Sequence, residues 1–338
     1  MTTTTGPRPG SGSQSSEDER AANELVEGEL RRWAGAEEDL MGVACRDALF
    51  PSGKLLRPRL CLWSAAAAGG TTEQALTFAA GLECMHVATL MHDDVVDRAP
   101  ERRGRASSAE HFGISVALMA GDGLASTAYE AMLASTEAGL PASRVVRATS
   151  VVAAAVKRTV AAIAEETLVR EDLSCTLEKV MEIVRGKTGA LFGAACQAGA
   201  ILANAPAAQE AALRAFGEEL GVAFQIRDDL LPYVGVVESG GLTDVANRQP
   251  TVPVVLARGA TSAEDLDRLQ ELFCAESDAV TAHRLLAQIL VRSNAVDEAA
   301  EMARTYAAKA REALATLPPS QTRDLLEALT VTVVDSAR

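Results

Sequence analysis

Two groups of acidic residues have the spacing and the surroundings that a divalent cation requires. The first lies in residues 86–103, which read HVATLMHDDVVDRAPERR. On a helix, Asp93 and Asp97 share one face because they are four residues apart, and Asp94 is one position further round. No cation lies between the three carboxylates, so their mutual repulsion calls for an outside positive charge. Magnesium fits, because it binds one or two carboxylates and completes its coordination shell with substrate phosphates.

A solvated acidic helix end is the alternative interpretation of this first group. Acidic side chains favour helix N-termini, where they interact well with the helix dipole. Here they follow a long apolar pattern and therefore fall near a predicted helix C-terminus, where negative charge is unfavourable. A functional role for the group is the better explanation.

The second acidic group lies in residues 221–232, which read GVAFQIRDDLLP. Gln225 precedes Asp228 by three residues and Asp229 by four, so the three side chains share a helical face. Two carboxylate groups that face each other across a cavity could hold several magnesium ions. Such an arrangement would bind a diphosphate and stabilise its departure.

Basic residues also cluster at short spacing in the sequence. Lys54 and Arg57 occur in GKLLRPRL, Arg102 and Arg103 follow the first acidic group, and Lys187 occurs in GKTGALF. A solvated surface position explains most of the 32 Lys and Arg residues. These five are singled out because they occur in segments where cations cluster at short spacing.

The segments that carry these residues are predicted to be helices of one large domain. Of the 338 residues, 48% are apolar and only 4% aromatic, so the core must consist of Ala, Leu and Val, which suits closely packed helices. No alternating run predicts a sheet, although residues 251–256 and 330–334 are ambiguous. Gly, Pro and charge clusters predict breaks at residues 51–53, 69–70, 100–105, 139–141, 204–206, 232–250 and 318–319.

Composition also excludes several classes of partner. A net charge of −14 argues against binding to nucleic acid or to an anionic membrane surface. Residues 1–18 are predicted to be a disordered tail with no signal-peptide pattern. Residues 188–209 are uncharged and long enough to span a bilayer, but their Ala and Gly content favours a buried helix. The six scattered cysteines are typical of a reducing compartment, so we expect a cytoplasmic protein without stable membrane insertion.

The order of these motifs resembles the trans-isoprenyl diphosphate synthase, or polyprenyl synthetase, family. The motifs are GKLLRPRL, HVATLMHDDVVD, RRG, AGD, KTGALF and FQIRDDLL, and the likeness runs from about residue 25 to the C-terminus. Bacterial geranylgeranyl diphosphate synthases are the most similar type. The resemblance implies an all-α, single-domain, isoprenoid-synthase-type helical bundle around a central apolar cavity, formed by residues 19–338 and usually present as a homodimer.

The resemblance also implies a function in isoprenoid and terpenoid biosynthesis. The enzyme would be a magnesium-dependent prenyltransferase that joins isopentenyl diphosphate head-to-tail (1'-4) to an allylic diphosphate, with three magnesium ions when substrate is bound. The direct magnesium ligands would be Asp93, Asp97 and Asp228, with Asp229 also in the metal site and Asp94 among the catalytic residues. Lys187 would be both catalytic and substrate-binding. The isopentenyl diphosphate would be held by Lys54, Arg57, His86 and Arg103, and the allylic diphosphate by Arg102, Lys187, Thr188, Gln225 and Arg248.

The sequence departs from the family pattern at four places, on or near the allylic side. Pro232 replaces the third aspartate of the second motif and removes a backbone donor. Gln249 replaces a lysine that helps to hold the allylic diphosphate, and the neighbouring Arg248 could supply the lost charge. A Gly-Gln pair is absent before Asp172, and residues 239–241 replace a Gly-Lys pair.

Two other functions remain open on the same scaffold: a terpene cyclase, or a non-catalytic partner subunit of a prenyl synthase. A cyclase has no need of the isopentenyl site, yet that site is intact. A partner subunit is expected to lose aspartates from both motifs, yet five of the six remain. An active elongating synthase is therefore preferred.

Product length is predicted from the residues that precede the first motif. Ala88 and Thr89 are small, whereas short-product enzymes of this family often have an aromatic residue there. Met85 is eight residues before Asp93 and therefore about 12 Å from it along the helix. It is the next candidate for the floor of the cavity, the residue that stops the growing chain. This pattern predicts a C20 product, geranylgeranyl diphosphate, although Met85 could equally be an ordinary core residue.

Overall fold

The computed structural model describes residues 11–35, 38–234, 242–274 and 278–335, with side chains from Glu17 onward. In the first part of the chain the elements are α1 (Ser11–Trp33), α2 (Leu40–Leu49), α3 (Leu56–Ala67), α4 (Thr72–Asp97), β1 (Glu101–Arg102), β2 (Arg105–Ala106), α5 (Ser108–Phe112), α6 (Ile114–Ala134) and α7 (Ala142–Leu168). They are followed by α8 (Leu177–Val184), the π-helix η1 (Arg185–Gly189), α9 (Ala190–Leu202) and α10 (Ala207–Val234). The last elements are α11 (Thr243–Ala246), α12 (Val252–Ala260), α13 (Ala263–Cys274), α14 (Ala279–Arg292), α15 (Ala295–Ala313), the 3-10 helix η3 (Leu314–Thr316) and α16 (Gln321–Asp335).

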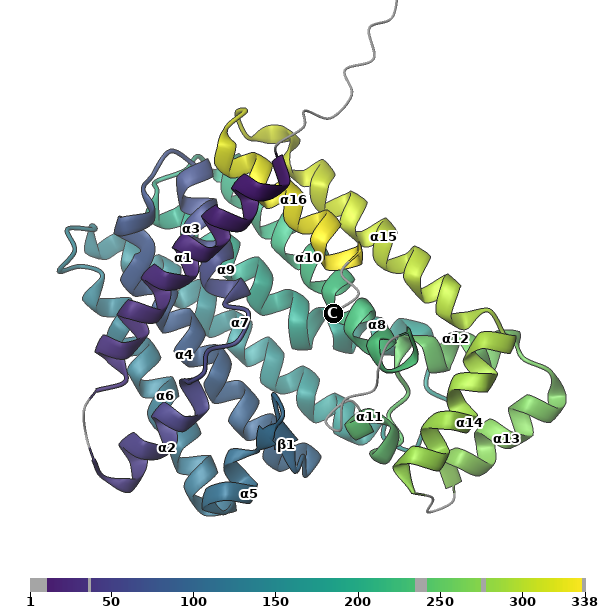
Figure 1. The fold of residues 1–338 in the computed structure, drawn as a ribbon. Helices are drawn as coiled ribbons and strands as arrows, with labels where there is room; N and C mark the ends of the chain where they lie inside the picture. The colour runs from purple at the N-terminus through teal and green to yellow at the C-terminus, as the bar shows by residue number, and fades with distance from the viewer. Residues whose placement is uncertain (1–10, 36–37, 235–241, 275–277, 336–338) are drawn as a thin grey trace, which may run out of the picture.

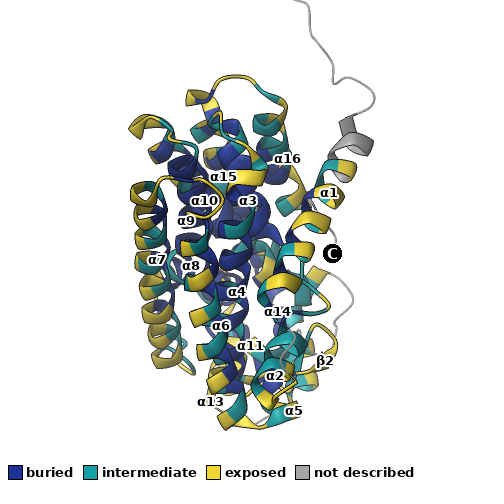
Figure 2. Ribbon diagram, turned by 90° about the vertical axis from the view of Figure 1, so that its left-hand side faces the viewer, coloured by how far each residue is buried: buried dark blue, intermediate teal, exposed yellow. Residues whose placement is uncertain are grey.

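These helices form a bundle whose interior is built from α3, α4, α9 and α10 (Figures 1 and 2). Nearly every residue of α9 is buried, which agrees with the interpretation of residues 188–209 as a packed helix. The main core contains residues of α1, α2, α3, α4, α6, α7, α9 and α10. A second core contains residues of α10, α12, α14 and α15. Among the described residues, no helix is long and apolar enough to cross a membrane.

Small residues allow the central helices to approach closely. A Cβ atom on Gly217 of α10 would lie 2.5 Å from the carbonyl oxygen of Phe192 and 2.8 Å from the Cα atom of Gly193, both in α9. A Cβ atom on Gly221 would lie 2.8 Å from the Cα atom of Gly189. These four positions, Gly189 at the end of η1, Gly193 in α9, and Gly217 and Gly221 in α10, form a glycine seam, named below for the helices α9 and α10 that it joins.

Six of the predicted breaks separate helices in the structure. The seventh, residues 232–250, was predicted too long: α10 continues through Pro232 to Val234, α11 lies at Thr243–Ala246, and residues 235–241 lie outside the described residues. The two ambiguous segments, by contrast, are helical: residues 251–256 lie largely in α12, and residues 330–334 lie in α16. Their β-branched side chains favour strands, but packing of an apolar helical face overrides such a preference. Of the six cysteines, Cys274 is exposed and Cys45 is partly buried, whereas the other four are buried.

The predicted tail is shorter than residues 1–18, because α1 begins at Ser11. Contacts explain the difference. Arg59 of α3 lies 2.7 Å from the carboxylate of Glu19, and Gln321 of α16 donates a hydrogen bond of 3.1 Å to Asp18. These partners come from distant parts of the chain and hold the first turns of the helix. Residues 1–10 lie outside the described residues, as do residues 239–241, the fourth departure from the family pattern.

Candidate active site

The first acidic group occupies the C-terminal end of α4, as predicted. The helix begins after Thr71, whose hydroxyl accepts a hydrogen bond from the backbone of Gln74, and its last residue is Asp97. Arg98 follows in a left-handed conformation, with φ of 51°, which ends the helix. Asp93 and Asp94 are buried, with 8% and 3% of their surface exposed.

Each carboxylate of this group is opposed by a cation from a different element. Asp94 accepts hydrogen bonds from Arg102 of β1, one of them at 2.9 Å from Nε, and Asp97 forms an ion pair with Arg170. Lys187 of η1 lies 3.7 Å from Asp93. The other oxygen of Asp93, Oδ1, is buried without a hydrogen-bond partner among the described residues.

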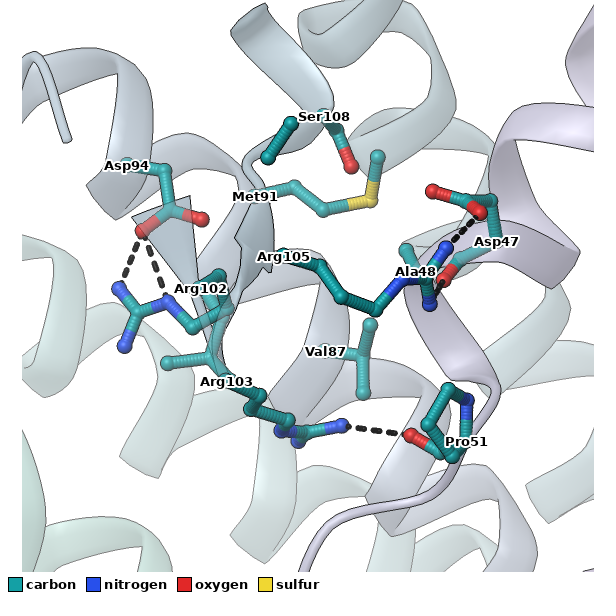
Figure 3. A pocket seen from close by; sticks show the side chains of 12 residues that line it. Asp47, Ala48, Pro51, Val87, Met91, Asp94, Arg102, Arg103, Arg105 and Ser108 are labelled. Atoms are coloured by element: carbon teal, nitrogen blue, oxygen red, sulfur yellow. Dashed lines mark hydrogen bonds and ion pairs between the residues drawn. The ribbon is translucent and has the colours of Figure 1, made fainter. Parts of the chain in front are cut away.

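The β1–β2 hairpin directs two arginines to different sides of its tip. The turn residues Arg103 and Gly104 both have positive φ, 54° and 72°, which matches the twist of a two-residue hairpin. Arg102 points toward Asp94, whereas Arg103 points toward the carbonyl oxygen of Pro51, 3.3 Å away (Figure 3). Gly53 makes this approach possible, because a Cβ atom there would lie 2.6 Å from the Arg103 guanidinium.

The predicted isopentenyl diphosphate residues lie together around the start of α3 and the middle of α4. Arg57 donates a hydrogen bond of 2.9 Å to Nε2 of His86, so the imidazole is in the neutral form that carries its proton on Nδ1. Burial lowers the pKa of His86 well below its usual value, and the charges of Arg57 and Arg103 lower it further. Burial also lowers the pKa of Arg57 to about 10, although Glu83 opposes this shift.

Aromatic rings support the two cations of this side. The Arg57 guanidinium lies 4.8 Å from the ring centre of Phe192, and the Lys54 ammonium lies 5.9 Å from that of Phe224. Rings at these distances attract cations through their quadrupole. Lys54 itself is exposed to solvent, and therefore available to an anionic ligand.

The second acidic group lies near the end of α10. Thr188 donates a hydrogen bond of 2.6 Å to Gln225, whose amide in turn donates one of 2.9 Å to Asp229. Asp229 also accepts a bond of 3.4 Å from the backbone N–H of Val252, at the N-terminal end of α12. This chain of contacts fixes Gln225 and Asp229, whereas the neighbouring Asp228 is exposed to solvent.

Pro232 lies outside this carboxylate group. It stands in the last turn of α10, which ends at Val234, and its carbonyl oxygen accepts a hydrogen bond of 2.8 Å from His283 of α14. The ring of Tyr233 stacks on His283. At the position where the family has a third aspartate, this chain has a proline whose backbone contacts α14.

Lys187 lies in the π-helix η1, where α7 approaches closely. Gly186 allows this approach, since a Cβ atom there would lie 2.6 Å from that of Ala162. The Lys187 ammonium lies 2.5 Å from the carboxylate of Glu166 near the end of α7. Burial alone would lower the pKa of Lys187, but the carboxylates of Glu166 and Asp93 raise it, so the lysine is charged.

Three charged residues of this region were not recognised in the sequence: Glu166, Arg170 and Asp244. Burial raises the pKa of Glu166 to about 7, against the opposing effect of Lys187. Desolvation by the surrounding protein raises the pKa of Asp244, and the positive charges of Lys187, Arg102 and Arg170 oppose this shift. Asp244 is nevertheless exposed to solvent, like Asp228.

The segment after α11 carries the substituted lysine position. Gln249 donates a hydrogen bond of 3.3 Å from its amide to the carbonyl oxygen of Glu166 and one of 2.8 Å from its backbone to that of Asp244. Arg248 has a φ of 49° and forms an ion pair with Glu171. The predicted substitute charge of Arg248 thus has an acidic partner in the loop that follows α7.

The carboxylates are suited to divalent cations that substrate phosphates also coordinate. Burial raises the pKa of Asp97 to about 6, and repulsion from Asp93 adds to the shift. Desolvation is the main cause that raises the pKa values of Asp228 and Asp229, and repulsion from the negative charge of Asp244 is the next. Among the described residues, no three His, Cys, Asp or Glu side chains are close enough to hold a metal ion by themselves. An ion would therefore bind one or two carboxylates and complete its shell elsewhere, as magnesium does with phosphates.

A pocket lies beside the first acidic group, between α2, α4 and the β1–β2 hairpin (Figure 3). The empty space between its walls is about 490 Å³, which includes space that belongs to the open solvent. Its walls combine the apolar side chains of Val87 and Met91 with the Asp94–Arg102 pair and Arg105, which is paired with Asp47.

Comparison with known proteins identifies the family. A family model described as polyprenyl synthetase matches residues 39–290. A short chain isoprenyl diphosphate synthase from Methanothermobacter thermautotrophicus is 33% identical over 84% of this chain and 86% of its own. A geranylfarnesyl diphosphate synthase from Aeropyrum pernix is 31% identical over 89% and 95%. A polyprenyl synthase from Caulobacter crescentus, complexed with calcium and isoprenyl diphosphate, has a TM-score of 0.88 at 28% identity over 98% and 100%.

The fold and the site define an all-helical protein whose site combines carboxylates suited to divalent cations with basic side chains suited to phosphate groups. Within that class, the chain belongs to the polyprenyl synthetase family and is a prenyltransferase of the trans-polyprenyl diphosphate synthase type. The family acts on isopentenyl diphosphate and allylic diphosphates and uses divalent metal ions. Other relatives are named as farnesyl, geranylgeranyl and octaprenyl diphosphate synthases, so the family alone leaves product length open.

Proposed function

We propose that this enzyme condenses isopentenyl diphosphate with an allylic diphosphate, 1'-4 and head-to-tail, to give C20 geranylgeranyl diphosphate. The observation that carries the proposal is the presence of cations around two different groups, the acidic motifs and His86. Arg102 and Lys187 act on carboxylates of both acidic motifs, whereas Arg57 and Arg103 act on His86, and Lys54 precedes Arg57 at the start of α3. Two separate diphosphates are what a condensation requires.

The proposed cofactor is magnesium, as three ions in the substrate complex. Asp93, Asp97 and Asp228 would bind them directly, and Asp94 and Asp229 would support these ligands. The unpartnered oxygen of Asp93 and the raised pKa values of the other carboxylates support this assignment. When bound, the ions would neutralise the charge of the allylic diphosphate and stabilise the departing pyrophosphate.

The side chains themselves bind and orient the two substrates. On the allylic side, Arg102 and Lys187 would bind the phosphate oxygens on which negative charge grows as the carbon–oxygen bond breaks. On the other side, Arg57 and Arg103 would hold isopentenyl diphosphate so that its double bond faces the allylic carbon. His86 is neutral and accepts from Arg57, so it would orient that guanidinium. The proton released from the product would leave with pyrophosphate.

Product length follows from the helix that carries the first motif. Met85 and Ala88 each have only 2% of their surface exposed, and the Thr89 hydroxyl donates a hydrogen bond of 2.7 Å to the carbonyl oxygen of His86. Small side chains at positions 88 and 89 leave room for the tail to pass toward Met85, about 12 Å from Asp93. The apolar cavity, the floor at Met85 and the homodimer of the family remain part of this proposal.

A product assay tests the proposal. Purified protein is incubated with magnesium, isopentenyl diphosphate and, in turn, dimethylallyl, geranyl and farnesyl diphosphate. We expect a single C20 diphosphate. Hydrocarbon formed from an allylic diphosphate alone would indicate a cyclase, and no product from any starter would indicate a partner subunit.

A further inference from the structure

Arg170 stands at the edge of the allylic site with part of its hydrogen-bonding capacity unused. It follows α7, and 19% of its side chain is exposed. One terminal nitrogen donates a hydrogen bond of 3.2 Å to the carbonyl oxygen of Val96, and the other forms the ion pair with Asp97. Its Nε is buried and has no hydrogen-bond partner among the described residues. A guanidinium has five N–H donors in a planar fork, which matches phosphate oxygens well.

The charge of Arg170 acts on the same carboxylates as the other two allylic-side cations. It stabilises the ionised forms of Asp97 and Asp244. Lys187 acts on both of these carboxylates, and Arg102 acts on Asp244. Arg102, Lys187 and Arg170 come from β1, η1 and the loop after α7, so they approach the site from three directions.

Position 249 of the same site is neutral, where the resemblance to the family implies a lysine. Gln249 is neutral, only 9% exposed, and held by its bonds to the carbonyl oxygens of Glu166 and Asp244. The charge of Lys187 is partly offset by Glu166 at 2.5 Å. Diphosphate binding therefore has less positive charge available than two lysines would supply.

We propose that Arg170 binds the allylic diphosphate and supplies the positive charge that Gln249 does not. In the free enzyme Arg170 is held on Asp97 at the C-terminal end of α4, whose dipole favours a cation. When a diphosphate enters, its oxygens compete with Asp97 for the guanidinium, and Nε provides the additional donor for a two-point contact. This inference rests on the proposed function, because the diphosphate in question is that of the allylic substrate.

The test compares Arg170→Gln with the unchanged enzyme by two readouts. One is the KM for the allylic diphosphate and, separately, for isopentenyl diphosphate. The other is the Kd for inorganic pyrophosphate with magnesium, measured by titration calorimetry. Loss of one charge-assisted contact should raise the allylic KM and the pyrophosphate Kd about 10- to 100-fold. The KM for isopentenyl diphosphate should stay within about twofold, because Arg57 and Arg103, which act on His86, are not among the charges that act on Asp97 beside Arg170.

Introducing a positive charge at position 249 gives a sharper test. Adding Gln249→Lys to Arg170→Gln should recover most of the lost affinity, because the two positions supply the same charge. Arg147→Gln is a matched control: Arg147 lies on α7 and is paired with Glu210, a carboxylate as little exposed as Asp97 but outside the site. It should change neither KM. If Arg170→Gln does not fold, Arg170→Lys keeps the charge without the fork and should give an intermediate KM.

Several results would overturn the inference. An unchanged allylic KM in Arg170→Gln, an equal rise in both KM values, or no recovery with Gln249→Lys would each show that Arg170 only stabilises Asp97. Failure of the proposed function has a different signature. In that case the unchanged enzyme forms no C20 diphosphate, although the pyrophosphate Kd still depends on Arg170.

Discussion

The glycine seam between α9 and α10 can be opened by one methyl group. A Cβ atom at Gly217 would lie 2.5 Å from the carbonyl oxygen of Phe192 and 2.8 Å from the Cα atom of Gly193. Ordinary contacts begin at 3.4 Å, and the obstructing atoms are backbone, which cannot change rotamer. In Gly217→Ala the two helices must therefore separate by about 1 Å, because protein interiors are close-packed.

The expected consequences differ in size for stability and for activity. Overpacking of this kind destabilises by about 1–3 kcal/mol. Replacing a helical glycine by alanine offsets about 0.5–1 kcal/mol of that loss. The same separation of the helices would lengthen the 2.6 Å hydrogen bond between Thr188 and Gln225, which joins η1 to α10. Because displacements near 1 Å can reduce turnover about 100-fold, kcat/KM should fall by about 10- to 100-fold.

Gly28→Ala is the matched control for this substitution. Gly28 lies in α1, and a Cβ atom there would have nothing within 4 Å. We expect this variant to unfold at a slightly higher urea concentration, since alanine favours the helix by about 0.5–1 kcal/mol. Urea unfolding and steady-state turnover are measured for both variants. Equal stability and equal turnover in the two would refute the reasoning that backbone contact at the seam positions the site.

Three further predictions concern the carboxylates and the product. Asp93→Ala should lose most activity and keep the circular dichroism spectrum of the unchanged protein, so near-normal turnover would contradict the assignment of the first motif. Thr89→Phe should shorten the main product by chromatography of the dephosphorylated alcohols, and an unchanged C20 product would exclude a floor at this level. Because burial raises the pKa of Asp97 to about 6, protonation should weaken magnesium binding as pH falls through 6. Asp97→Asn should bind magnesium more weakly throughout and lose that pH-dependent step in a calorimetric titration; a step of the same size in the variant would assign it to another group.

The helices and the two acidic motifs could be predicted because the information is local. The spacing of Asp93 and Asp97, and of Gln225 and Asp229, places each pair on one face of a helix, and the structure shows those helices. Gly and Pro mark the ends of elements for equally local reasons. The boundary of α1 was missed because Glu19 and Asp18 are held by α3 and α16, which are distant in the sequence.

The additional charged residues of the site depend on tertiary contacts that no local pattern shows. Glu166 lies in a charged run that looks like a solvated helix face, until Gly186 brings Lys187 to it. Arg170 joins a loop to Asp97, a residue 73 positions earlier. Asp244 begins the segment DVANRQ, whose substituted lysine position was the only signal that could have drawn attention to it.

The π-helix at residues 185–189 constrains how this enzyme can change over generations. A π turn contains about one residue more than an α turn, so α8 and α9 are offset by roughly 100° relative to one continuous α-helix. Deletion of any one residue here would rotate the buried side of α8, including Val180, Met181 and Val184, out of its packing against the second core. A substitution within RGKTG leaves the helix phase unchanged, whereas a single-codon deletion would change it at once. The length of this segment is therefore expected to stay constant among descendants of the gene, in addition to the residues whose contacts fix them, Gly186, Lys187, Thr188 and Gly189.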